Sequence, residues 1–249
     1  MSEVSRRLSL EKIVQSQGFG SRKECRSLIR SGRVTVAGEV CTDFQAEFAT
    51  AGLRFMVDDE EWLYQAQAYL VLHKPADYEC SHRPLHHRSV FSLLPEPLVE
   101  RGVQSVGRLD ADTSGLLLLS DDGAWLHALT SPRRHVPKTY RATLRHPLTS
   151  GQCAALIAGV VLRDDPQPVA ALAAEAVDTH TLRLTIGEGR YHQVKRMVAA
   201  AGNRVEALHR ERVGAFALPP ELAEGAWRWL TPAEVAACRE VPAGEGESV

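Results

Sequence analysis

The stretch of sequence that decides the fold is SVGRLDADTSGLLLLSDDG, which runs from Ser105 to Gly123. Its four consecutive leucines, bounded by turn-forming residues, predict a short strand that is buried on both faces. A turn aspartate most often binds its own backbone, and this interpretation suits Asp112, which opens an Asp-Thr-Ser-Gly corner. Asp110 stands before that corner, two residues after Arg108. We therefore interpret Asp110 as a nucleophile that a rigid, buried strand holds in place.

Length and composition exclude several classes of protein. The chain has 249 residues and is 44% hydrophobic, which is enough for one large or two modest domains with a real core. No apolar run is long enough to cross a bilayer, and the N-terminal residues MSEVSRRLSLEK do not form a secretory signal. The five cysteines form no CxxC pair. We therefore expect a cytoplasmic protein with reduced thiols, no disulfide framework and no metal site.

The net charge of −2 hides a strong segregation of charge along the chain. Residues 1–40 contain eight Lys and Arg against four Glu, and residues 183–212 contain seven against three. The compensating acid lies in DDEE at 58–61 and in the C-terminal EGESV. Clusters of this kind are typical of a face that binds a polyanion, although solvated helix faces would give the same pattern.

The first forty residues predict two short helices and a strand. In GSRKECRSLIRSGRVTVAGE, residues 20–39, Ser21 and Glu24 have the spacing of a capping box. Arginines at i, i+4 and i+8 of the helix that follows form a basic stripe. This segment resembles the S4 domain, a small RNA-binding module of ribosomal protein S4 and of several RNA-modifying enzymes. The resemblance implies contacts with RNA phosphates from Arg22, Lys23, Arg26, Arg30 and Arg33.

The pattern changes from Ala68 onward. Short runs such as AYLVLHKP, TYRATL and TLRLTIG predict strands, and helices are expected at 123–130, 151–159 and 191–201. The expected strands and helices do not alternate regularly along the chain. This arrangement predicts an α+β domain with a mainly antiparallel mixed sheet flanked by helices. We expect three parts: an S4-like α/β module at 1–62, a larger catalytic domain at 67–236 and a flexible acidic tail at 237–249.

The central stretch is similar to the signature of the RsuA-type pseudouridine synthases, which modify ribosomal small-subunit RNA and have relatives acting on the large subunit. Three further segments agree in order. They are LHKPADYECS at 72–81, SPRRHVPKTY at 131–140 and LTIGEGRYHQVKRMVAAAGNRVEALHRERVG at 184–214. With the S4-like start, the resemblance covers nearly the whole chain except the tail. It implies an enzyme that isomerises a specific uridine of 16S ribosomal RNA to pseudouridine.

The resemblance also implies roles for single residues. Asp110 takes the position of the catalytic aspartate, which must be ionised and held in a site that excludes water. Lys195 takes the position of the basic partner that keeps this carboxylate charged. Tyr140 matches the active-site tyrosine, whose ring stacks on uracil and whose hydroxyl helps to remove the C5 proton, although a packed core tyrosine would fit the same strand.

A uridine inside folded RNA must be flipped out to be reached, and Arg108 is the candidate to fill the gap or, alternatively, to pair with Asp110 or Asp112. The family's Asn-Lys-Pro motif is changed here, but its lysine is kept at position 74. As further residues that contact RNA or shape the pocket, the resemblance suggests Lys74, Arg190, His192 and Gln193.

Three alternatives stay open at this point. The chain could modify large-subunit (23S) ribosomal RNA, or it could be a catalytically silent RNA-binding protein of ribosome assembly. It could also hydrolyse a glycosidic bond, but glycosidases use two acids, whereas this motif pairs its acid with a lysine. No nucleotide- or flavin-binding loop occurs in the sequence, so no cofactor is expected. The expected partner is ribosomal RNA or an assembling small-subunit particle.

Overall fold

A computed structural model describes residues 6–163 and 165–240. The chain divides into two compact units. The first contains Met1–Ala68 and Leu94–Gln104, and the second contains Tyr69–Leu93 and Ser105–Val249. Within the described residues, no helix is long and apolar enough to cross a membrane.

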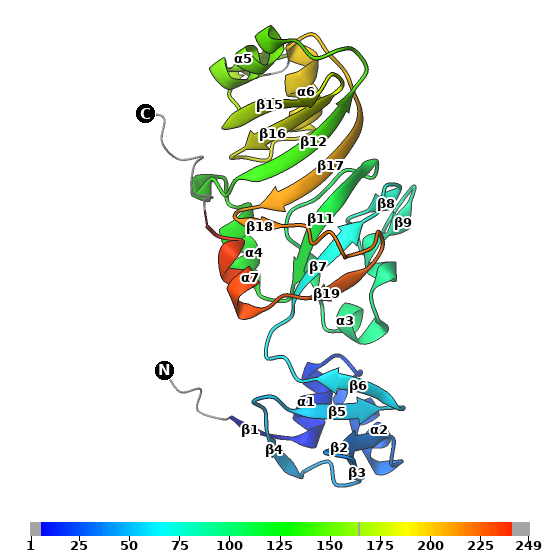
Figure 1. The fold of residues 1–249 in the computed structure, drawn as a ribbon. Helices are drawn as coiled ribbons and strands as arrows, with labels where there is room; N and C mark the ends of the chain where they lie inside the picture. The colour runs from blue at the N-terminus through cyan, green and yellow to red at the C-terminus, as the bar shows by residue number, and fades with distance from the viewer. Residues whose placement is uncertain (1–5, 164, 241–249) are drawn as a thin grey trace. The chain divides into compact units, whose positions relative to one another are not determined.

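The first unit is a small α/β module (Figure 1). A four-stranded antiparallel sheet has the order β3-β2-β5-β6, and β1 pairs with β4. Buried side chains come from both helices, with Leu10, Ile13 and Ile29, and from the sheet, with Phe55. The elements of this unit are β1 (Arg7–Ser9), α1 (Leu10–Ser16), α2 (Arg22–Arg30), β2 (Val34–Val36), β3 (Glu39–Val40), β4 (Glu47–Ala49), β5 (Arg54–Val57), β6 (Glu60–Leu63) and α3 (Glu96–Glu100).

Helix α2 begins at the predicted capping box. The Ser21 hydroxyl accepts from the Glu24 N–H at 3.4 Å, and the Glu24 carboxylate accepts from the Ser21 N–H at 2.7 Å. Two of the four free N–H groups at the helix start are thereby satisfied. Strand β2 is followed by Ala37 and Gly38, whose positive φ angles make the tight turn into β3. Local sequence therefore sets this part of the module.

The segment Leu94–Gln104 lies inside the expected catalytic domain but packs with the first unit. Its Arg101 guanidinium donates to the Gln17 side-chain oxygen at 3.0 Å and to the Gln65 carbonyl at 2.8 Å. A Cβ at Gly18 would lie 1.9 Å from the Pro97 carbonyl oxygen, so only glycine allows this close approach. The sequence did not predict this packing, because the contacts join residues that lie far apart along the chain.

The second unit is built on one large sheet with the order β15-β16-β12-β17-β11-β7-β19, to which β10 and β18 add short strands. Its pairings along this order are antiparallel except between β11 and β17. The predicted α+β class with a mainly antiparallel mixed sheet is confirmed. The strands are β7 (Tyr69–Lys74), β8 (Tyr78–Glu79), β9 (Arg88–Ser89), β10 (Gln104–Ser105), β11 (Thr113–Ser120), β12 (Lys138–Leu144), β13 (Val160–Leu162), β14 (Asp165–Val169), β15 (Ala173–Asp178), β16 (Thr181–Ile186), β17 (Val205–Val213), β18 (Phe216–Ala217) and β19 (Trp227–Trp229).

Strand β11 carries the four leucines and is the best-buried strand of the sheet. Leu116, Leu117, Leu118 and Leu119 are fully buried, as predicted from their unbroken run. The parallel partner β17 approaches so closely that a Cβ at Gly115 would lie 2.4 Å from a backbone oxygen. The strand is therefore a rigid support for the loop that precedes it.

The helices of this unit are α4 (Gly123–Thr130), α5 (Ser150–Ala158), α6 (Gln193–Ala200) and α7 (Pro232–Ala237), with short 3-10 helices at η1 (Val90–Leu93) and η2 (Pro132–Arg134). In Figure 1, α5 and α6 lie toward the β15 end of the sheet, whereas α4 and α7 lie near β18. The predicted start of the acidic tail at residue 237 is wrong, because Cys238 is fully buried in the hydrophobic core with Trp125 and Phe216. The rest of the predicted tail, residues 241–249, lies outside the described residues.

Candidate active site

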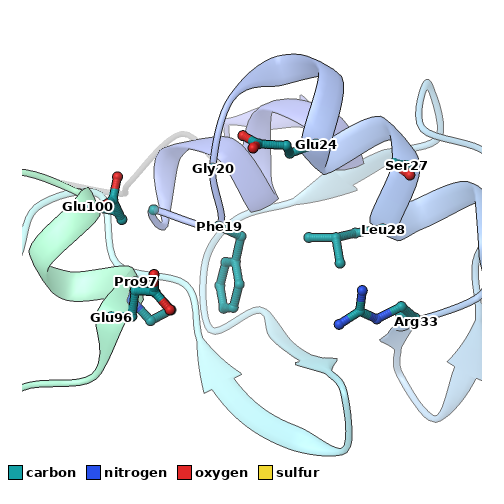
Figure 2. Close-up of a pocket in the computed structure, with 10 residues that line it drawn as sticks. Phe19, Gly20, Glu24, Ser27, Leu28, Arg33, Glu96, Pro97 and Glu100 are labelled. Carbon is teal, nitrogen blue, oxygen red and sulfur yellow. The ribbon is translucent and has the colours of Figure 1, made fainter.

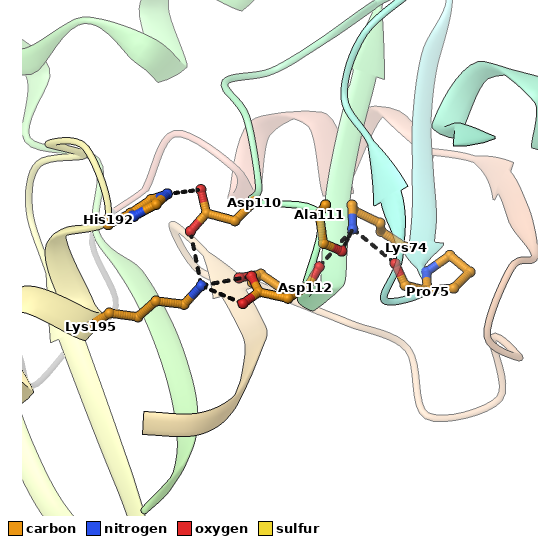
Figure 3. Close-up of polar contacts among 8 residues, drawn as sticks. Lys74, Pro75, Asp110, Ala111, Asp112, His192 and Lys195 are labelled. Carbon is orange, nitrogen blue, oxygen red and sulfur yellow. Dashed lines mark hydrogen bonds and ion pairs between the residues drawn. The ribbon is translucent and has the colours of Figure 1, made fainter. Parts of the chain in front are cut away.

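Asp110 lies in a tight turn that leads into β11. The Thr113 N–H donates to the Asp110 carbonyl at 3.1 Å and closes the turn. The Lys74 ammonium donates to the carbonyls of Ala111 at 3.0 Å and of Thr113 at 2.8 Å, as well as to that of Pro75 at 2.8 Å. Figure 3 shows this lysine on one side of the turn, with Asp110 and Asp112 facing away from it. Two carbonyls of the Asp110 turn are thus tied to the end of β7.

The predicted contact between Lys74 and RNA is wrong. The Lys74 side chain is fully buried, and its three donors are used by the three carbonyls. Burial lowers the pKa of this ammonium below its usual value. A buried lysine without a carboxylate at contact distance is costly, and its hydrogen bonds to the three carbonyls offset part of that cost.

The Asp110 carboxylate contacts the Lys195 ammonium and the His192 imidazole, which come from a distant part of the sequence. Lys195 Nζ is 3.3 Å from Asp110 Oδ2, and His192 Nε2 is 3.3 Å from Asp110 Oδ1 (Figure 3). The carboxylate is one-third exposed, at 33%. The structure therefore brings Lys195 to Asp110, as predicted, and adds His192 as a second neighbour of the same group.

Asp112 is the stronger partner of Lys195, which the sequence did not indicate. Lys195 Nζ lies 2.6 Å and 2.9 Å from the two carboxylate oxygens of Asp112, closer than to Asp110. Burial alone would raise the pKa of Asp112, but the hydrogen bonds and charge of Lys195 outweigh it and the pKa is lowered. Burial would likewise lower the pKa of Lys195, yet the two carboxylates outweigh it and the pKa is raised. The ammonium is thus held charged between the two acids. In the sequence, the two-residue spacing of Asp110 and Asp112 was the only indication that both could contact one lysine.

Tyr140 and Asp110 line the same small hollow, of about 90 Å³. Tyr140 comes from β12 and is 8% exposed. The hollow is lined by Arg108, Leu109, Asp110, Thr113, Tyr140, Ile186, Gly189, Arg190, His192, Gln193, Val194, Lys195 and Leu208. The three predicted catalytic residues therefore meet at one place, although they lie on different elements.

Arg190 and Gln193 shape the wall of the hollow and hold its backbone. Arg190 forms ion pairs with Asp165 and with Glu188, the latter at 3.1 Å, so its charge is already engaged. Gln193 is buried, and its side-chain oxygen accepts from the Arg190 N–H at 2.8 Å. This geometry supports a role in positioning the Glu188–Arg190 loop. Contact of either residue with RNA stays a prediction.

Arg108 is exposed and lines the rim of the hollow. Among the described residues, it forms no ion pair with Asp110 or Asp112, which was the alternative role considered from the sequence. Its guanidinium is therefore available at the mouth of the site.

The predicted basic stripe of α2 is partly neutralised within the first unit. Arg22 lies 3.0 Å from a carboxylate oxygen of the buried Glu11, and Arg26 pairs with the other oxygen. Arg30 lies over the Phe44 ring, with its guanidinium carbon 4.8 Å from the ring centroid. The remaining members of the set have different surroundings: Arg33 is paired with Asp58, whereas Lys23 has no ion pair within the described residues.

The first unit has a hollow of its own, lined in part by α2. It measures about 440 Å³ and contains the Phe19 ring and the Arg33 side chain together with three glutamates (Figure 2). Its lining residues are Gly18, Phe19, Gly20, Glu24, Ser27, Leu28, Arg33, Glu96, Pro97 and Glu100. None of the predicted catalytic residues lies there. Across the described residues of both units, no group of three or more His, Cys, Asp or Glu could hold a metal ion.

Comparison with known proteins decides the family. The family model described as RNA pseudouridylate synthase matches residues 68–200, and the S4 domain model matches residues 8–43. This chain belongs to the RNA pseudouridylate synthase family. It is 41% identical to the ribosomal small subunit pseudouridine synthase A of Salmonella typhimurium over 92% of this chain and 99% of that protein. Its identity to the protein of that name in Escherichia coli K12 is 40%, with the same coverage.

The fold agrees with this family assignment. A solved structure described as a pseudouridylate synthase aligns with a TM-score of 0.66 and 36% identity, covering 93% of this chain and 99% of the other. The S4 domain match includes α1, α2 and β2, so the predicted module is confirmed as a member of that domain type. The family model for the synthase spans β7, β11, β12 and α6, which carry or support the hollow around Asp110.

Proposed function

We propose that this chain converts a uridine of small-subunit ribosomal RNA to pseudouridine, with Asp110 as the nucleophile and the target base flipped out of the RNA. The observation that carries the proposal is the 3.3 Å contact between Lys195 Nζ and Asp110 Oδ2 beside the hollow that Tyr140 lines. The names of the relatives, which act on the ribosomal small subunit, support the choice of substrate.

The reaction is an isomerisation and needs no co-reactant. The bond between uracil N1 and ribose C1′ breaks, the base turns, and a bond between C5 and C1′ forms. The C5 proton is lost and N1 gains one, so atoms and electrons balance. Asp110 adds either to the ribose or to the uracil ring, and either step needs an ionised carboxylate at a fixed position.

Lys195 and the turn around Asp110 meet these two requirements. The ammonium, 3.3 Å from the carboxylate, places a positive charge beside it that remains when RNA excludes water. Lys74 and the buried strand β11 fix the turn, so little ordering is left for the moment of binding. Asp112 holds Lys195 in place through contacts of 2.6 Å and 2.9 Å.

Tyr140 and Arg108 serve the flipped base in this proposal. The Tyr140 ring stacks on uracil, and its hydroxyl helps to move the C5 proton. The exposed Arg108 enters the RNA and fills the space that the base has left, because its guanidinium is planar and binds phosphates. In this scheme residues 1–62 give affinity through phosphates, and residues 67–236 carry out catalysis.

The direct test is release of tritium from RNA labelled at C5 of uridine. Asp110→Asn is expected to abolish release while leaving RNA affinity nearly unchanged, because phosphate contacts dominate binding. Lys195→Met removes the cation and is also expected to abolish release. The matched control is Asp121→Asn, at the other end of β11. Release at the wild-type rate from Asp110→Asn would contradict the role given to this residue.

The modified position is identified by carbodiimide primer extension on ribosomal RNA from a strain that lacks the gene. Loss of one pseudouridine from small-subunit RNA is the expected result. Loss from large-subunit RNA would correct the substrate, and no loss together with no tritium release would favour a silent binding protein. Free uracil among the products would favour hydrolysis instead.

A further inference from the structure

Tyr191 is an exposed aromatic side chain beside the catalytic hollow. It is 76% exposed, although its neighbours Arg190 and His192 both line the hollow. Large apolar side chains that stay in water next to a binding site indicate a surface that a ligand covers. None of the steps assigned above to the reaction uses this ring.

One contact orients the Tyr191 ring and a second holds its backbone. Its plane lies 20° from that of the His192 ring, with the centroids 3.8 Å apart, so the two rings are stacked. The Arg196 guanidinium donates to the Tyr191 carbonyl at 3.0 Å and holds the backbone from the first turn of α6. The ring is therefore preorganised, which reduces the entropy that a ligand would have to remove.

His192 connects this ring to the reacting carboxylate. Its φ of 48° lies in the left-handed region, which is unfavourable for a residue other than glycine. In this conformation its Nε2 is 3.3 Å from Asp110 Oδ1 and its ring carries Tyr191. One face of the Tyr191 ring covers the histidine, and its large exposed fraction leaves the opposite face open to solvent.

The geometry points to a stacking subsite on the open face of Tyr191 for a second, unpaired base of the substrate RNA, adjacent to the flipped uridine. This inference rests on the proposed function, because a flipped nucleotide leaves its neighbour without a stacking partner. An aromatic ring next to the nucleophile replaces that partner. Every base has a π-face, so the subsite gives affinity for a single-stranded neighbour without requiring one particular base.

A purely structural role for Tyr191 makes a different prediction. If the ring only fixed His192, its removal would displace the imidazole from Asp110 and slow turnover on bound RNA. If the ring stacks on RNA, its removal weakens binding. Because the ring is uncharged, loss of a stack on RNA leaves the slope of log Kd against log salt unchanged.

The experiment measures binding of a transcript of small-subunit ribosomal RNA to the Asp110→Asn protein, which binds without turnover. Adding Tyr191→Ala is expected to raise Kd about 5- to 150-fold, the range for loss of one aromatic–base stack. Tyr191→Phe keeps the ring and is expected to retain the affinity. The control Leu85→Ala removes a side chain that is 84% exposed in the same unit and lies outside the lining of the hollow.

With Asp110 intact, Tyr191→Ala is expected to raise KM far more than it lowers kcat. Unchanged Kd in Tyr191→Ala, or an equal loss in Tyr191→Phe, would overturn the subsite. A fall in kcat with KM unchanged would assign the ring to the support of His192 instead. If the Asp110→Asn protein itself does not bind the transcript, the proposed function is wrong and the subsite is wrong with it.

Discussion

Replacement of Lys138 by methionine is expected to stabilise the second unit in a pH-dependent manner. Lys138 begins β12, two residues before Tyr140, and its ammonium donates to the Val136 carbonyl at 2.9 Å. Burial, followed by the nearby positive charge of Arg210, lowers the pKa of Lys138 from 10.5 to about 8. Both causes act against the ammonium and no nearby acid is among them, so the charged form destabilises the folded protein.

The size of the effect follows from this pKa. Each tenfold change in proton affinity corresponds to about 1.4 kcal/mol, so the charged lysine costs up to about 3 kcal/mol at pH 7. The value is an upper limit because the Lys138 side chain is only half-buried. The unfolded chain holds the proton up to about pH 10.5, whereas the folded chain loses it near pH 8. Wild-type stability therefore rises with pH between these values, and the advantage of Lys138→Met shrinks there.

The assay is urea unfolding followed by tryptophan fluorescence at pH 7 and pH 9.5. Trp125, Trp227 and Trp229 lie in the second unit and report on it. Lys138→Met is expected to gain up to about 3 kcal/mol at pH 7 and about 2 kcal/mol less at pH 9.5. Lys138→Arg is the control, because arginine stays charged throughout this range. A gain of equal size at both pH values, or no gain at pH 7, would refute the reasoning.

Two further predictions concern packing and RNA affinity. Gly115→Ala places a Cβ 2.4 Å from the Arg210 backbone oxygen at a φ of 105°, so we expect a loss of at least about 3 kcal/mol in urea unfolding. Gly123→Ala, where a Cβ meets nothing within 4 Å, is the matched control, and an equal effect at both positions would contradict the close approach. Arg30→Ala should lower the slope of log Kd against log salt by about 0.7 to 0.9, the value for one lost phosphate contact, in filter binding at several salt concentrations. An unchanged slope would remove Arg30 from the RNA contacts, and Arg54→Ala, an exposed arginine of β5, provides the comparison.

The local structure follows from short-range patterns. The buried strand β11 follows from four adjacent leucines, and the start of α2 follows from Ser21 and Glu24 three residues apart. These features depend on side-chain period and on capping chemistry, which act over a few residues. The grouping of Asp110, Tyr140 and Lys195 came instead from the resemblance of whole segments to a known family, since no local rule joins positions so far apart.

The contacts of the basic residues depended on the tertiary structure. Lys74 was assigned to RNA from the family resemblance, but the pairing of β7 with β11 buries it beneath the turn that carries Asp110. Lys195 was matched to Asp110, whereas the fold also gives it a closer partner in Asp112. A charge in a sequence does not specify its counterion, because the partner depends on which strands are adjacent.

The amino-acid sequence by itself determined the first two helices, the buried strand β11 and the turn chemistry beside Asp110, because capping and hydrophobic period are local, whereas the strands β15 and β17 were not predicted. Only the tertiary structure decided that Lys195 bridges two carboxylates 83 and 85 residues away, that His192 contacts Asp110, and that Tyr191 is stacked beside them with an open face. The physical reason is that these contacts arise where the first turn of α6, with the loop before it, meets the turn before β11. That meeting is set by the order of strands in the sheet rather than by any neighbouring residues.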